Sequence, residues 1–193
     1  LDEVIEPRAT QEEMTNFIET ELTESLKGLP TRTTQFGRFD KGLAYTILMK
    51  YYMHEKNWAK AEECGRELLK AEYGYGLMDR YADIFTLENE GNKEIIFACT
   101  EERGTNLQLW HDHALPGNYP TKNASIQKWD GYKVPWPFYR TFEEGDDRLS
   151  VLVGEYVGTD GVLFNEESDI AKHGNLYSGA VPVKYGEDPE STG

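Results

Sequence analysis

The stretch 40–71 constrains the fold most strongly, because apolar residues recur there with helical spacing on both sides of a short polar turn, 54–57. Before the turn, two neighbouring stripes are apolar: Leu43, Ile47 and Tyr51, and beside them Ala44, Leu48 and Tyr52. After the turn, the expected inward residues are Trp58, Ala61, Leu68 and Leu69. The stretch therefore predicts a hairpin of two packed helices, similar in size to a tetratricopeptide-type unit.

The ends of these two helices carry capping residues. Asp40 and Asn57 stand where a side-chain oxygen can accept from the unpaired backbone N–H groups of a helix start. Gly74 follows the second helix and tolerates the left-handed conformation that ends many helices. Ala61 is small where the two helices must approach closely, so we expect it at their contact.

Helical patterns continue on both sides of the hairpin. A helix is expected over 10–27, with a capping box between Thr10 and Glu13. Its expected buried stripe is Met14, Phe17, Ile18, Leu22 and Leu26. A short helix is expected over 79–85, and 94–99 is expected to form a brief strand or an extended segment.

Beyond Thr100 the helical period disappears, and Gly, Pro, Asn and aromatic residues dominate. The sequence predicts a long irregular region over 104–137 and one helical turn over 138–142. Segments 151–157 and 162–164 are expected to pair across a turn that contains Asp160-Gly161. The remainder, 165–193, is polar and Gly-rich and is expected to be a loop with a frayed end.

Several short motifs follow the hairpin in order. They are Tyr75-Gly76-Leu77, Asp79 to Phe85, Glu88 to Asn92 and Lys93 to Ala98, and Gly37 to Ala44 leads into the hairpin. This order resembles the SusD-like (RagB/SusD) family of surface glycan-binding lipoproteins, in which a helical hairpin precedes a Y-x-L … Y … F … N … E-I-I-F run. The likeness extends over residues 10–148 and depends on the order of the motifs, since no single one would suffice.

The resemblance implies a mainly α-helical fold, with tetratricopeptide-like hairpins, long decorating loops and minor β structure. We expect one domain over 1–193, with a helical part over 10–99 and a loop-rich part over 100–193. The implied function is non-catalytic glycan binding at the cell surface for nutrient uptake, without a cofactor. The implied partners are an oligosaccharide and a SusC-like TonB-dependent transporter, and the implied location is the outer membrane of a Bacteroidetes-type cell.

A lipoprotein of this family begins with a signal peptide and a lipid-modified cysteine, whereas this sequence starts Leu1-Asp2-Glu3-Val4. We therefore expect an internal fragment of a longer chain. The two cysteines, Cys64 and Cys99, stand in apolar contexts, which favours buried free thiols, with a disulfide as the alternative. No stretch is apolar over the length that a membrane-spanning helix needs.

Charge and motifs argue against several other classes. The formal net charge is -15, from 20 Lys and Arg against 35 Asp and Glu, which disfavours nucleic-acid binding. His111-Asp112-His113 lacks a third metal ligand at a recognisable spacing, and Asp160-Gly161 lacks the pattern of a calcium loop. No nucleophile-elbow motif is present, and no carboxylate pair is singled out for glycoside hydrolysis.

Recognition of a sugar by aromatic rings is the remaining hypothesis, because pyranose rings present a C–H face that packs on Trp and Tyr. The predicted ligand-binding residues are Trp110, Tyr119, Trp129 and Trp136, with the polar neighbours Asn106, Gln108, Asn118, Asn123 and Gln127. The structural alternative is that these aromatic residues fasten the loops to the helical core.

Two other functions stay open at this stage. One is a tetratricopeptide-type scaffold for a peptide or protein, and the other is a polysaccharide-degrading enzyme. Exposed aromatic residues gathered on a loop-built face would favour sugar, and aromatic residues along the concave face of the helices would favour peptide. An acid pair across a cleft would favour the enzyme.

Overall fold

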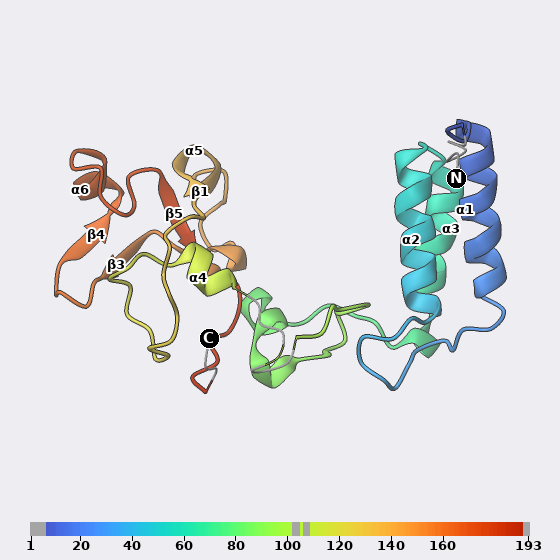
Figure 1. Cartoon of the computed structure of the whole chain (residues 1–193), viewed down its shortest axis with the longest axis horizontal. Coiled ribbons are helices and arrows are strands. Elements are labelled where there is room, and N and C mark those ends of the chain that lie inside the picture. The colour runs from blue at the N-terminus through green and yellow to red at the C-terminus, as the bar shows by residue number, and fades with distance from the viewer. Residues whose placement is uncertain (1–6, 102–104, 106–108, 191–193) are drawn as a thin grey trace, which may run out of the picture. The chain divides into compact units, whose positions relative to one another are not determined.

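The computed structural model describes residues 7–101, 105 and 109–190. The chain forms two compact units (Figure 1). The first holds the described residues up to Leu77 together with Lys93–Cys99, and the second holds Met78–Asn92 and the described residues from Thr100 onward. Taken together, the described elements are mainly helical with minor sheet, as predicted.

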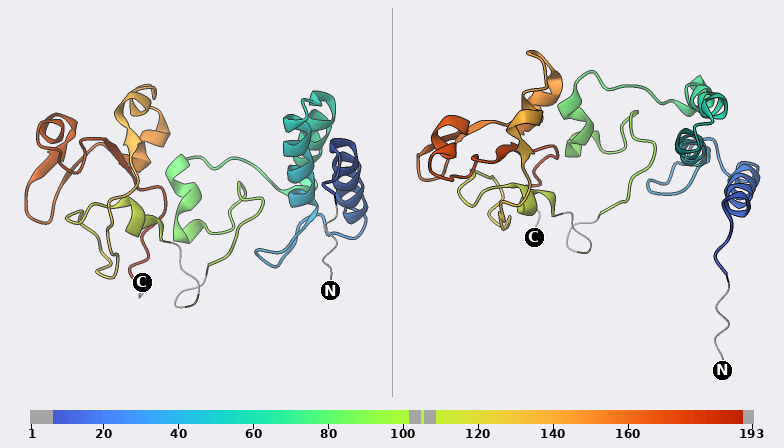
Figure 2. Two further views of the ribbon diagram at one scale, coloured as in Figure 1. Left: turned by 45° about the horizontal axis from the view of Figure 1, so that its top comes forward. Right: turned by 90° about the horizontal axis from the view of Figure 1, so that it is seen from above.

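The first unit is a group of three α-helices. They are α1 (Gln11–Ser25), α2 (Lys41–His54) and α3 (Trp58–Leu68), followed by the 3-10 helix η1 (Ala71–Tyr73). The helices run side by side in Figure 1, and the right-hand view of Figure 2 looks along their axes. α2 and α3 form the predicted hairpin, and α1 packs beside them.

The helix starts have the caps that the sequence predicts. Asp40 accepts from the backbone N–H of Leu43 at 3.0 Å, and Asn57 accepts from that of Lys60 at 3.3 Å. Thr10 caps α1, and its capping box with Glu13 is complete. Each side chain supplies an acceptor to a donor that the helix itself leaves unpaired.

The buried face of the hairpin is narrower than the sequence suggested. On α2 the stripe of Ala44, Leu48 and Tyr52 is buried, whereas Ile47 of the neighbouring stripe is exposed. On α3 the buried residues are Ala61, Cys64 and Leu68. The prediction for Trp58 and Leu69 is wrong, because these side chains are 63% and 81% exposed. Trp58 is the first residue of α3 and Leu69 its C-cap, so neither lies within the part of the helix that packs on α2.

The expected buried stripe of α1 forms only in part. Ile18, Leu22 and Leu26 are half-buried, but Met14 and Phe17 are exposed, so the prediction for these two is wrong. α1 has no fully buried residue. α1 contacts chiefly α2.

Of the two forms expected for 94–99, a brief strand or an extended segment, the strand does not form. Two local predictions in the first unit need correction. α3 ends at Leu68 on a right-handed cap, and the left-handed Gly74 (φ +65°) instead caps η1. Cys64 is buried but Cys99 is exposed, and both are free thiols.

Substituting leucine for Ala61 should destabilise the first unit by about 1–3 kcal/mol, because the added atoms overpack the contact between α2 and α3. Thermal unfolding followed by circular dichroism measures this. The exposed Ala59→Leu on the same helix is the matched control and should leave the midpoint nearly unchanged. Equal midpoints for both variants would mean that the buried face is wrongly assigned.

The second unit is built from short elements. Its helices are η2 (Tyr81–Phe85), η3 (Leu87–Asn89), α4 (Trp110–Ala114), α5 (Trp136–Tyr139), η4 (Asp147–Val151) and α6 (Glu166–Ile170). Its strands are β1 (Val134–Pro135), β2 (Leu152–Val153), β3 (Glu155–Val157), β4 (Leu163–Asn165) and β5 (Gly179–Pro182). The short helix expected over 79–85 is thus the 3-10 helix η2, and the helical turn expected over 138–142 begins earlier, at Trp136.

The strands form two small antiparallel sheets. β5 lies between β1 and β2, pairing Ala180 with Val134 and Val181 with Val153. β3 and β4 form the predicted hairpin, with Tyr156 opposite Phe164. The hairpin turn has Gly161 at φ +77°, a conformation that favours glycine.

The core of the second unit lies around β5. Its buried members are Ala114, Leu115, Trp136, Tyr156, Leu176, Ala180 and Val181. The prediction of a polar loop over 165–193 is therefore wrong, because this segment supplies α6, the central strand and three core residues. All four residues of β5 are buried even though the strand is short and begins with glycine.

No helix within the described ranges is long and apolar enough to cross a membrane.

Candidate functional site

A loop in the second unit, 127–132, is fastened to α4 by its backbone. The N–H groups of Asp130, Gly131 and Tyr132 donate to carbonyl oxygens of Leu115, His113 and His113, at 3.1, 2.6 and 3.0 Å. The N–H of Trp129 donates to the carbonyl of Asp112. The last turn of α4 and the residue after it have carbonyl groups that the helix leaves unpaired, and the loop uses them.

This loop holds an uncommon backbone conformation on both sides of Trp129. Lys128 and Asp130 have φ of 59° and 58°, in the left-handed region that disfavours residues with a side chain. Such conformations persist where surrounding contacts fix them, and they gather at binding sites. The fastened loop presents Trp129 with 51% of its surface exposed.

Trp129 is the outer end of a row of five touching rings, which we call the aromatic platform: Trp129, His113, Tyr132, Trp110 and Tyr185. Successive ring centroids lie 4.7, 5.1, 5.4 and 5.4 Å apart. Trp129, Tyr132 and Tyr185 are exposed, and Trp110 and His113 are half-buried between them. The platform therefore brings together ring surface from residues far apart in the sequence.

The platform is anchored to the core at the Trp110 end. The indole N–H of Trp110 donates to the carbonyl of Pro182 at 3.0 Å, and Pro182 is the last residue of β5. Nε2 of the buried His111 lies 3.0 Å from the carbonyl oxygen of Tyr185. These contacts hold the Trp110 end of the platform in place on the core.

The structure separates the four predicted site residues. Trp110 and Trp129 belong to the platform. Tyr119 packs against Tyr156, with ring centroids 5.0 Å apart, and belongs to the surroundings of the core. Burial raises the pKa of Tyr119, and it raises the pKa of Tyr156 to about 12.

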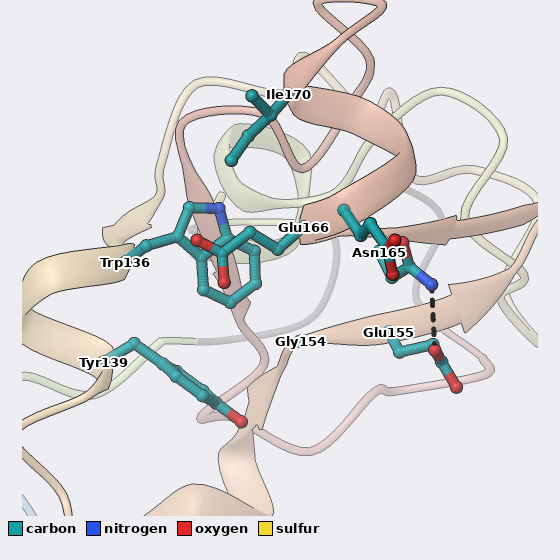
Figure 3. A pocket seen from close by; sticks show the side chains of 8 residues that line it. Trp136, Tyr139, Gly154, Glu155, Asn165, Glu166 and Ile170 are labelled. Carbon is teal, nitrogen blue, oxygen red and sulfur yellow. Dashed lines mark hydrogen bonds between the residues drawn. The ribbon is translucent and has the colours of Figure 1, made fainter.

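Trp136 has a structural role. It is 6% exposed, and its indole N–H donates to the carbonyl of Leu176 at 2.8 Å. One side of this indole lines a pocket in which Tyr139 and Gly154 also take part (Figure 3). Sequence reasoning could not separate the buried indole from the exposed one, because both stand in irregular Gly- and Pro-rich sequence.

The predicted polar neighbours are mostly used within the protein. Asn118 accepts from the Tyr156 hydroxyl at 2.8 Å, and Asn123 donates to the carbonyl of Asp188 at 2.8 Å. Gln127 is exposed and is the first residue of the loop 127–132. Asn106 and Gln108 lie outside the described residues.

The His111-Asp112-His113 segment is helical, so alternate residues do not project to the same side. Asp112 accepts from the backbone N–H of Gln127 at 2.7 Å, and His113 lies between Trp129 and Tyr132. Within the described ranges, no group of three or more His, Cys, Asp or Glu is placed to hold a metal ion.

Sequence reasoning missed His113, Tyr132 and Tyr185 as members of the platform. A local signal existed for His113 alone, since it follows Trp110 by three residues on one helix. Tyr185 has no such signal. It reaches the platform because it follows the central strand β5.

No protein-family model matches the chain, and no curated protein matches it. Several solved structures match the chain. A SusD-like protein from Bacteroides fragilis has 24% identity and a TM-score of 0.57, and the match covers 76% of this chain and 31% of that one. Surface glycan-binding protein A from Bacteroides thetaiotaomicron, in complex with laminarihexaose, has 17% identity and a TM-score of 0.67, with coverage of 94% and 42%.

The chain has a SusD-like fold. The resemblance inferred from the order of the sequence motifs is thus confirmed for the fold. A further SusD superfamily protein from B. fragilis matches this fold with 17% identity and a TM-score of 0.67, covering 94% of this chain and 42% of that one. The chain accordingly spans between about a third and two fifths of the length of these SusD-like structures.

Proposed function

We propose that this chain is part of a non-catalytic, cell-surface glycan-binding protein, and that the aromatic platform is where it contacts an oligosaccharide. The observation that carries the proposal is the row of five rings, three of them exposed. Two of the exposed rings, Trp129 and Tyr132, stand on a loop that is hydrogen-bonded to α4. Ring surface of this kind suits the C–H faces of sugars.

The matched structures support the same class of ligand. One of the SusD-like folds that resemble this chain is a surface glycan-binding protein in complex with laminarihexaose, a neutral glucose oligomer. Its sequence is only 17% identical, so the likeness supports the class of ligand and leaves the contact residues to the geometry of this chain.

The wider setting belongs to the same proposal. The two units would form part of one SusD-like domain, in an outer-membrane lipoprotein that delivers glycans to a SusC-like TonB-dependent transporter for nutrient uptake. This follows from the SusD-like fold and from the surface location printed for one matched structure.

The place of the exposed rings bears on the alternative of a peptide-binding helical scaffold. Trp129, Tyr132 and Tyr185 lie on loops of the second unit. Exposed aromatic residues on a face built from loops favour a sugar ligand over a peptide ligand. The enzyme alternative concerns the pocket beside Trp136, because glutamates line it.

Replacing Trp129 with alanine should weaken oligosaccharide binding by at least about tenfold, because binding free energy concentrates in a few aromatic anchors. Isothermal titration of the intact chain with laminarihexaose and other neutral hexasaccharides measures the affinity. The affinity should change little between low and high salt, since no charge pairing drives it. The melting midpoint should stay within error of the parent, because Trp129 is half exposed.

Phe138→Ala is the matched control, since it removes an exposed aromatic ring of the same unit outside the platform. It should bind as the parent does. The proposal fails if Trp129→Ala binds normally, or if the parent binds none of the hexasaccharides. Release of new reducing ends from a bound glycan, lost on mutating Glu155 and Glu166, would place the protein among the enzymes.

A further inference from the structure

The second ring of the aromatic platform, His113, lies between the two exposed rings of the loop 127–132. Its imidazole stacks on Tyr132, with centroids 5.1 Å apart and 23° between the ring planes. It meets Trp129 edge to face, with centroids 4.7 Å apart and an angle of 75°. The backbone carbonyl of His113 also accepts from the N–H groups of Gly131 and Tyr132. Ring contacts and backbone hydrogen bonds therefore hold this imidazole in one place within the platform.

Neither nitrogen of the His113 imidazole has a hydrogen-bond partner or an ion pair among the residues that the structure describes. Within the same residues, the Tyr75 hydroxyl is the one buried side-chain nitrogen or oxygen that lacks a partner. The unpaired nitrogens of His113 are therefore not buried, although the residue as a whole is half-buried. They reach solvent between the two exposed rings, where a ligand of the platform would meet them.

The neighbouring polar groups are already engaged. The indole N–H of Trp110, the other half-buried ring of the platform, donates to a backbone carbonyl of β5 at 3.0 Å. The side-chain nitrogen of Gln127, at the start of the loop, donates to the carbonyl of Ser125 at 3.3 Å. Of the two half-buried rings, His113 is thus the one whose hydrogen-bonding atoms are left for a ligand.

An imidazole at this place adds something that ring stacking does not supply. Stacking on a C–H face selects weakly among sugars, because pyranose rings in general present such a face. A neutral imidazole has one donor and one acceptor nitrogen, and a sugar hydroxyl can match either. A site that pairs with a hydroxyl also rejects a ligand that lacks it, because the protein group then loses its water without gaining a partner.

We propose that His113 is a specificity-determining residue of the platform. One imidazole nitrogen hydrogen-bonds to a hydroxyl group of a neutral sugar, while the C–H face of that sugar packs on Trp129. This assignment rests on the function proposed for the platform, and it adds the group that recognises a hydroxyl.

His113→Phe should weaken the binding of laminarihexaose by about fivefold, the share of one neutral hydrogen bond. The variant keeps a ring between Trp129 and Tyr132 and keeps the backbone carbonyl, so it removes the two nitrogens and little else. Isothermal titration of the intact chain measures the affinity. Hydrogen exchange at the amides of Trp129, Gly131 and Tyr132 shows whether the loop stays fastened to α4, and it should be as slow as in the parent.

His173→Phe is the matched control. It makes the same exchange at an exposed imidazole of the second unit, one that packs on Tyr177 with ring centroids 5.1 Å apart and lies outside the platform. It should bind laminarihexaose as the parent does.

A second measurement needs no variant. The side-chain nitrogen resonances of the histidines can be followed by NMR at about pH 8, where imidazoles are largely neutral. Saturation of the parent with laminarihexaose should move a ring-nitrogen resonance of His113 and leave those of His173 in place. A His113 side chain that only packs between its neighbours would keep both nitrogen resonances unchanged.

Three results would contradict this role of His113: parent-like binding by His113→Phe with its loop intact, an equal loss in His173→Phe, or unmoved His113 nitrogen resonances at saturation. If the loop of His113→Phe loosens, the nitrogen resonances of the parent decide. Loss of binding in Trp129→Ala with normal binding in His113→Phe would leave the platform standing and reject the role of His113 alone. A parent that binds no neutral hexasaccharide would reject the proposed function, and the role of His113 with it.

Discussion

Trp136→Ala should lower the free energy of unfolding of the second unit by about 3–5 kcal/mol, the range found for large aromatic residues removed from a core. The indole is 6% exposed and packs among Leu115, Leu176 and Ala180. Its N–H also donates to the carbonyl of Leu176 at 2.8 Å, so alanine would leave a cavity and a buried acceptor without its partner.

Thermal unfolding followed by near-ultraviolet circular dichroism measures this loss. Trp129→Ala is the matched control, because it removes the same side chain from a site that is 51% exposed, and it should leave the midpoint nearly unchanged. Trp136→Ala should thus destabilise the folded second unit, whereas Trp129→Ala should weaken ligand binding and leave the unit folded. A fully folded Trp136→Ala with normal packing would contradict the core role of this indole.

Some of the fold is predictable because its causes are local. The caps at Asp40, Asn57 and Thr10 depend on residues within four positions, and all three form as predicted. The hairpin turn before Val162 depends on Asp160-Gly161 in the same way. A pattern that is complete within one turn can be recognised from sequence alone.

The choice of buried face is less local. Helical spacing marks two adjacent stripes on α2, and only contact with α3 selects the one that contains Leu48 and excludes Ile47. On α3 the same contact buries Cys64 and leaves Trp58 exposed, against the order of hydrophobic size. The partner helix decides which residues face inward, and the spacing of apolar residues along one helix does not specify that choice.

The candidate site depends on contacts over still longer distances along the chain. The sequence indicated Trp110 and Trp129, but it also indicated Trp136 and Tyr119, which pack on the core instead. Exposure of Trp129 arises from hydrogen bonds between its loop and α4, and Tyr185 joins the platform from beyond the last strand. These relations exist only once the chain is folded.

The segment 165–193 shows why composition misleads. It is polar on average, yet three of its apolar residues, Leu176, Ala180 and Val181, are completely buried. A four-residue strand is too short for period-two alternation to be seen, and β5 is buried on both faces, so no alternation exists.

Gly179→Ala should disrupt the three-stranded sheet and destabilise the second unit by about 3 kcal/mol or more, at the upper end for overpacking. A Cβ at this position would lie 2.1 Å from the carbonyl oxygen of Val134 and 2.6 Å from its carbonyl carbon. These are backbone atoms of β1, so relief requires the strands to separate, and no side chain can rotate away. β1 pairs with β5 through Pro135–Gly179 and Val134–Ala180, so separation loses this pairing and loosens Trp136, the next residue.

Thermal unfolding and amide hydrogen exchange of Ala180 and Val181 measure the effect of Gly179→Ala, with faster exchange expected at both. Gly117→Ala is the matched control in the same unit, because no atom lies within 4 Å of the Cβ that it would add. The control should keep the parent's midpoint and exchange rates. Equal behaviour of the two variants would mean that β1 does not lie against Gly179, and the three-stranded arrangement around β5 would then be wrong.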